Sequence, residues 1–133
     1  MPRLWQYKNI TYLDAENLAV ASSTLPARTR FAGSAAAATD KGGTRGGVGF
    51  VWAQFLPIQN PGRLFNDCFR YSVELYGVLW VSFYGQQDPI SCKRMVTETL
   101  LTLQTTRLPF IVIGDFNLRQ HAMSEHLAQS ASR

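Results

Sequence analysis

Cysteine is scarce in this sequence, and long apolar runs are absent from it. The two cysteines, Cys68 and Cys92, are too few for a disulfide scaffold and show no Cys-x-x-Cys or Cys/His zinc spacing. No apolar run approaches the roughly 18 residues that a membrane-spanning helix needs, and the first residues carry neither a signal-peptide core nor a transit pattern. We therefore expect an intracellular protein, nuclear or cytoplasmic, that is not secreted, binds no membrane and keeps its thiols reduced.

Nucleotide-binding loop motifs are also missing. The glycine-rich segment KGGTRGG, residues 41–47, contains neither G-x-G-x-x-G nor G-x-x-x-x-G-K-[ST]. A dinucleotide or P-loop site in this segment is therefore disfavoured.

The composition is that of one globular domain. The chain has 133 residues, of which 46% are hydrophobic and 17% charged, so we expect a single domain over 1–133. The net charge of +4 lies in residues 1–63, where seven Lys and Arg face three acids, while the rest balances six against six. A basic first half is compatible with a phosphate-rich partner such as nucleic acid.

The hydrophobic pattern predicts an α/β fold with layered helices and strands. An apolar strand is expected at 47–55, a β-hairpin at 70–85 around Tyr76-Gly77, and a buried strand at 110–114. Asp88-Pro89 is typical of a helix N-cap and first turn, and the helix should run to about Arg107. Residues 21–46 are rich in Ala, Ser, Gly and Arg and are interpreted as a long connection, and the tail from residue 118 is weakly helical.

The segment FIVIGDFN, residues 110–117, carries the strongest chemical signal. It places Asp115 and Asn117 on the same side of a strand end, two residues apart. A carboxylate and an amide in this position can bind a phosphate group together with a hard cation. The same two residues can also simply form an Asx-turn after a strand.

Three motifs in order resemble the endonuclease/exonuclease/phosphatase superfamily, which includes abasic-site endonucleases, DNase I and retrotransposon endonucleases. They are GGVGFVW at 46–52, VSFYG at 81–85 and GDFN at 114–117, and the resemblance covers roughly residues 10–120. It implies a four-layer α/β sandwich with a mainly antiparallel sheet, of which this chain would hold a part. It also implies a hydrolase active site where loops from both sheets meet.

The resemblance assigns roles to four residues. It implies that Asp115 positions or activates the attacking water and that Asn117 binds the scissile phosphate. Tyr84 matches an aromatic whose hydroxyl contacts phosphate, or it is one more half-buried strand aromatic. Glu16 matches a ligand of Mg²⁺, with Mn²⁺ as a substitute and Asp115 as a second ligand, or it is an ordinary surface carboxylate.

The sequence also departs from the family's pattern. The proline that should follow Tyr84 is absent, the flanks of Glu16 do not match, and an early strand ending in Asn is missing. The C-terminal Asp-His pair that supplies the general base is absent as well, since His121 and His126 follow GDFN too closely and are expected in a solvated tail. The chain therefore resembles a domain shortened at both ends, whose inner face (Val51, Val73, Leu75, Val81, Ile111) would be exposed.

Two functions follow from the resemblance. The first is a Mg²⁺-dependent phosphodiesterase that hydrolyses nucleic acid, DNA before RNA, or another phosphoester, with activity impaired by the missing base. The second is a non-catalytic nucleic-acid-binding domain or a degenerate retroelement remnant, which would bind through Arg28, Arg30, Lys41 and Arg45. In either case a partner chain could complete the fold.

Overall fold

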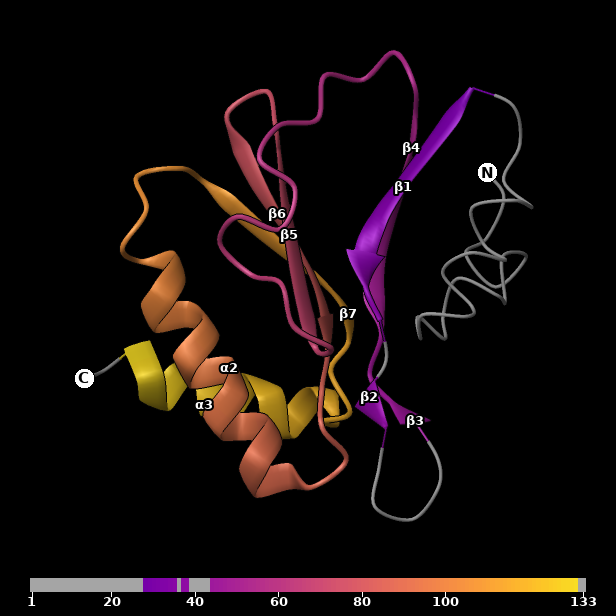
Figure 1. Cartoon of the computed structure of the whole chain (residues 1–133). Coiled ribbons are helices and arrows are strands. Elements are labelled where there is room, and N and C mark those ends of the chain that lie inside the picture. Colours follow the sequence, from indigo (N-terminus) through magenta and orange to yellow (C-terminus); the bar gives the residue numbers. More distant parts are fainter. Residues whose placement is uncertain (1–27, 36, 39–43, 132–133) are drawn as a thin grey trace.

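In a computed structural model that describes residues 28–35, 37–38 and 44–131, these residues form three sheets and two helices (Figure 1). In chain order the elements are β1 (Thr29–Ser34), β2 (Ala37–Ala38), β3 (Thr44–Arg45), β4 (Val48–Ala53), β5 (Arg70–Leu75), β6 (Val78–Tyr84), α2 (Pro89–Leu103), β7 (Phe110–Asp115) and α3 (Gln120–Ala131). All strand pairs are antiparallel except β6–β7. The predicted mixed α/β class with a mainly antiparallel sheet is confirmed.

The three-stranded sheet β5-β6-β7 forms the middle layer. Helix α2 covers one of its faces, and the β1–β4 pair lies against the other, with β4 in contact with β5 and β6 (Figure 1). Two sheets that face each other with helices outside one of them agree with part of the sandwich that the resemblance implies. Within the described part of the chain, no helix covers the outer side of β1–β4.

The hairpin β5–β6 turns at the two residues that the sequence analysis singled out. Tyr76 and Gly77 both have positive φ, 51° and 74°, as a tight two-residue hairpin turn requires. The turn fixes a register in which Val73 pairs with Trp80 and Ser72 with Val81. The predicted hairpin at 70–85 is thus confirmed.

Helix α2 begins where the sequence predicted and ends earlier. The Asp88 carboxylate accepts a hydrogen bond from the Ser91 backbone N–H at 3.1 Å, and Pro89 occupies the first helical turn. The helix ends at Leu103 rather than near Arg107, because the Thr105 hydroxyl donates to the Thr102 carbonyl at 2.6 Å. Such side-chain bonds compete with the helical backbone pattern.

The cap predicts a pH dependence of stability. A hydrogen bond from the Ser91 hydroxyl, followed by one from its backbone N–H, holds the pKa of Asp88 below its ordinary value. A lowered folded-state pKa stabilises the fold above the unfolded-state pKa of about 3.9, and this contribution is lost as the pH falls through the folded pKa. We expect Asp88→Asn, which keeps a capping oxygen without a titrating carboxyl, to show a smaller loss of urea resistance on acidification than the unsubstituted chain. Equal acid sensitivity of the two proteins would contradict this role.

Apolar clusters form the core on both faces of the middle sheet, two on the helix side and one on the other. On the helix side, Val81 and Phe83 of β6 pack with Leu103 and Cys92 of α2, and each is at most 2% exposed. Alternate residues point the other way, so Trp80 and Tyr84 join Val73 against the β1–β4 sheet. The buried α2 residues Met95, Val96 and Leu103 all belong to the clusters on the helix side of the sheet.

Strand β7 corrects one expectation. The run FIVIG was predicted to be a buried strand, yet Ile111 and Ile113 are 39% and 43% exposed. The reason is position, because β7 lies at the edge of its sheet among the described strands, while β4 packs on β5 and β6. The sequence analysis also predicted that five residues on the inner face would be exposed. Of these five, only Ile111 is exposed. Val73 is buried, and Val81 faces α2 instead.

A second correction concerns the segment 21–46. It was interpreted as a connection, but residues 29–34 form β1, which pairs with β4 over its whole length. Small and polar residues in β1 hide the strand pattern, and tertiary pairing overrides weak local preference. The described remainder of the segment includes the short pair β2–β3.

Candidate functional site

The residues predicted to carry chemistry meet where β6 and β7 end. These two strands are parallel, so their carboxyl ends lie at the same edge of the sheet. Tyr84 and Asp115 are direct partners in the register, and residues paired in this way project from the same face. The sequence placed the two side chains in separate motifs, and the structure makes them neighbours.

Asp115 and Asn117 form a tight turn immediately after β7. The Asn117 backbone N–H donates to Asp115 Oδ1 at 3.0 Å, and Asn117 has a positive φ of 51°. The Asn117 side-chain amide donates to the carbonyl oxygen of Gly85, which follows β6. The Asx-turn interpretation is therefore confirmed as geometry. Apart from this bond, the exposed Asp115 carboxylate accepts no hydrogen bond from the described residues.

Two glycines allow the strand ends to approach each other. The Gly85 N–H donates to the Asp115 carbonyl at 2.7 Å. A Cβ at Gly85 would overlap the Phe116 carbonyl oxygen, and one at Gly114 would overlap the Phe83 carbonyl oxygen. Only residues without a side chain fit at these two positions, and together they set the distance between Tyr84 and Asp115.

Tyr84 is also a packing residue. Its ring stacks on Phe69 with a centroid distance of 6.2 Å, and it lies against the cluster between the sheets. The strand-aromatic interpretation therefore describes its ring, while contact of its hydroxyl with phosphate stays a prediction.

A buried thiol lies directly behind the site. Cys92 on α2 is fully buried and its Sγ–H donates to the Phe116 carbonyl at 2.9 Å. Burial raises the pKa of the Cys92 thiol, and the negative charge of Asp115 raises it further. The thiol stays protonated at neutral pH and ties α2 to the turn that carries Asp115.

The other predicted residues lie either elsewhere in the fold or outside the described part of the chain. Glu16 and Lys41 lie outside the described residues, as does the side chain of Arg45. His121 and His126 lie on α3, where His121 is paired with Glu125 at 3.0 Å and His126 lies 2.9 Å from the Thr97 hydroxyl. In the described part of the chain no three His, Cys, Asp or Glu side chains gather as a metal-binding group.

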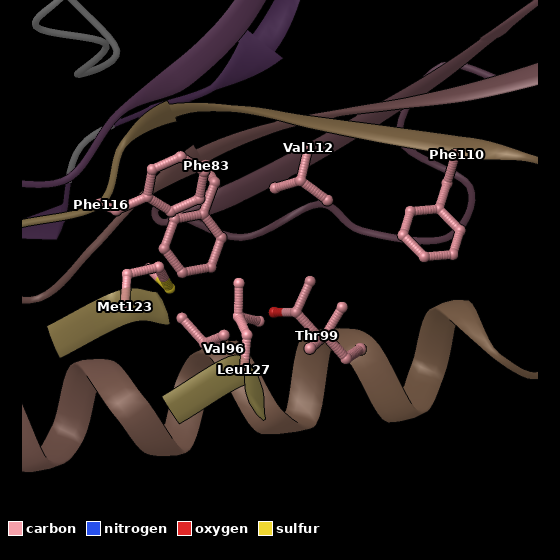
Figure 2. Close-up of a pocket in the computed structure, with 9 residues that line it drawn as sticks. Phe83, Val96, Thr99, Phe110, Val112, Phe116, Met123 and Leu127 are labelled. Carbon is pink, nitrogen blue, oxygen red and sulfur yellow. The ribbon is translucent and has the colours of Figure 1, made fainter. Parts of the chain in front are cut away.

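Sequence reasoning missed an apolar cavity beside the site. It measures about 290 Å³ and lies between β6, β7, α2 and α3 (Figure 2). Phe83, Val112 and Phe116 line it from the sheet side and Val96 and Met123 from the helices (Figure 2). The only signal in the sequence was the aromatic spacing around GDFN, which does not distinguish a cavity from a packed core.

Comparisons with known proteins add no further information. The chain matches no protein-family model, no curated protein and no solved structure. The resemblance therefore depends on the three sequence motifs alone. Neither of the helices that the structure describes is long and apolar enough to cross a membrane.

Proposed function

We propose that the chain is a Mg²⁺-dependent phosphodiesterase domain of the endonuclease/exonuclease/phosphatase type, acting on nucleic acid at the carboxyl ends of β6 and β7. One observation carries this proposal: Tyr84 and Asp115 are register partners, and the Asn117 turn follows directly. A phenol, a carboxylate and an amide thus share one exposed sheet edge. These are the groups that a phosphate and its cation need.

The donor set suits a hard divalent cation. The Asp115 carboxylate is exposed, and the turn occupies only one of its oxygens with a backbone hydrogen bond. Mg²⁺ is commonly held by one or two carboxylates while it keeps several of its waters, and when bound it polarises a phosphoryl oxygen. Asp115 would hold the ion, and Glu16 stays a predicted second ligand.

The neighbouring polar groups would position the phosphate. The Asn117 amide has two N–H donors, and only one of them is needed for the bond to Gly85. The other is available for a phosphoryl oxygen, as is the Tyr84 hydroxyl. Because the bond to Gly85 fixes the amide in one orientation, binding would require little reordering of the side chain.

A second candidate is a nucleic-acid-binding domain without catalysis. The exposed arginines at the start of β1 favour it. Arg28 and Arg30 are exposed, and neither forms an ion pair with another described residue. Such cations contact phosphates without sequence preference, so their contribution to binding falls with salt.

One experiment separates the two candidates. We expect calorimetry to detect Mg²⁺ or Mn²⁺ binding at millimolar concentrations, and supercoiled plasmid to be nicked with Mg²⁺ but not with EDTA. Asp115→Asn should abolish metal binding and lower nicking about 100-fold or more. Glu98→Gln, which removes an exposed carboxylate on α2, is the matched control and should change neither.

The contrary results are equally specific. If no metal binds and no plasmid is nicked, but DNA affinity falls steeply between low and high salt, the chain is a binding domain. If DNA affinity is also independent of salt, both candidates fail.

A further inference from the structure

The outer edge of β7 has its main-chain groups directed away from the sheet. Among the described strands only β6 pairs with β7. The Pro109 and Asp115 carbonyls accept hydrogen bonds from Leu79 and Gly85 on the β6 side. Because main-chain direction alternates along a strand, the N–H and C=O groups of Phe110, Val112 and Gly114 point to the other side.

The apolar part of β7 carries neither the charge nor the proline that commonly protects an edge strand. Between Phe110 and Gly114 the strand has no charged residue and no proline. Natural edge strands are commonly protected by Lys, Pro or a bulge, because an open apolar edge pairs with another strand. Ile111 and Ile113 are 39% and 43% exposed on one face, and Phe110 is 40% exposed on the other.

The edge is complementary to a second copy of itself. An antiparallel pair centred on Val112 places Val112 opposite Val112 and Phe110 opposite Gly114, so every outward main-chain group meets its counterpart. Ile111 then lies opposite Ile113 on the other face, and the Phe110 ring covers the bare Gly114 backbone of the other copy. No charged residues of like sign face each other within the pair.

We propose that the chain forms a two-fold dimer through β7, in which each copy also supplies Arg107 to the Asp115 site of the other. Because the paired strands run in opposite directions, the segment before one β7 lies at the carboxyl end of the other. That end carries Asp115 and Asn117. Arg107 is exposed and forms no ion pair with a described residue of its own copy.

Through Arg107, the second copy would add a positive charge beside Asp115. A guanidinium binds phosphate through two parallel hydrogen bonds, so Arg107 would contact a phosphate held beside Asp115. This role of Arg107 depends on the proposed function, whereas pairing of the β7 strands does not.

Sedimentation equilibrium of the full chain tests the dimer. We expect a dimer for the unsubstituted chain and a folded monomer for Ile111→Lys/Ile113→Lys, because opposed lysines repel within the pair. The control Phe55→Lys/Leu101→Lys adds the same charge at two apolar residues that are 83% and 59% exposed, and should stay dimeric. Circular dichroism establishes that each variant is folded. A monomeric unsubstituted chain, or a dimer that survives the β7 lysines, overturns the proposal.

Cross-linking tests the register. Ile111 and Ile113 would be a pair without main-chain hydrogen bonds, whose Cα separation of about 4.5 Å suits a disulfide. A mixture of Ile111→Cys and Ile113→Cys chains should therefore cross-link on mild oxidation. Neither variant on its own should cross-link, and the unsubstituted chain should not cross-link either. Cross-linking of one variant with itself would show a different register.

A DNA-binding cycle tests the contribution of Arg107. With EDTA present to prevent cleavage, Arg107→Ala should weaken binding of a labelled duplex about tenfold in the dimer. It should have little effect in the Ile111→Lys/Ile113→Lys monomer. If Arg107→Ala weakened DNA binding equally in the dimer and in the monomer, Arg107 would act within its own copy. If it did not weaken binding in the dimer, Arg107 would not contribute to the site. The metal-binding experiment with Asp115→Asn decides the proposed function independently of either result.

Discussion

Gly114→Ala should destabilise the fold by about 3 kcal/mol or more. Gly114 has a φ of 148°, and an added Cβ would overlap the Phe83 carbonyl oxygen and lie close to the Phe83 backbone N. Neither atom can move without separating β6 from β7, since both belong to the paired backbone. Denaturation in urea, followed by circular dichroism, measures the loss.

Gly77→Ala is the matched control for this prediction. Gly77 also has a positive φ, 74°, but a Cβ there would meet nothing within 4 Å. Gly77→Ala should therefore lower the free energy of unfolding by only about 1 kcal/mol, which is the cost of a positive φ for a residue with a Cβ. Equal stability of the two variants would contradict the close approach of β6 to β7 at Gly114.

Phe83→Ala should lower the free energy of unfolding by about 3–5 kcal/mol. Phe83 is 2% exposed, stacks on Phe116 with a centroid distance of 5.2 Å and contacts α2. Its removal would enlarge the neighbouring cavity, whose walls are held by two strands and two helices and can collapse only in part.

The comparison for this variant is Phe55→Ala. Phe55 is the most exposed of the large hydrophobic residues that the structure describes, at 83%, so its truncation should change stability by less than about 0.5 kcal/mol. The unfolding midpoints of the two variants in urea give the difference. Comparable losses at both positions would contradict the assignment of Phe83 to the core.

The local parts of the fold could be predicted from the sequence. The Tyr76-Gly77 turn and the Asp88-Pro89 cap depend on neighbouring residues, and the structure confirms both. The Asp115–Asn117 turn was predictable for the same reason. In each case a few adjacent side chains determine the backbone.

What could not be predicted depends on distant partners. An apolar run such as FIVIG indicates a strand, but its burial depends on how many strands lie opposite it. Strand β1 was missed because its pairing with β4, rather than its own sequence, makes it a strand. The placement of Tyr84 beside Asp115 requires the parallel pairing of β6 and β7, which no motif specifies. The role of Glu16 stays a prediction.

The parallel pairing of β6 with β7 would link the concentration of the proposed ligand to the amount of folded protein. Helix α2 separates the two strands in sequence, so Tyr84 and Asp115 are adjacent only after the crossover has closed. A ligand that contacts both residues binds the folded chain alone and stabilises it by mass action, by about 2.7 kcal/mol at a concentration of 100 Kd. The supply of the cation or phosphate would then set how much of the chain escapes proteolysis in the cell.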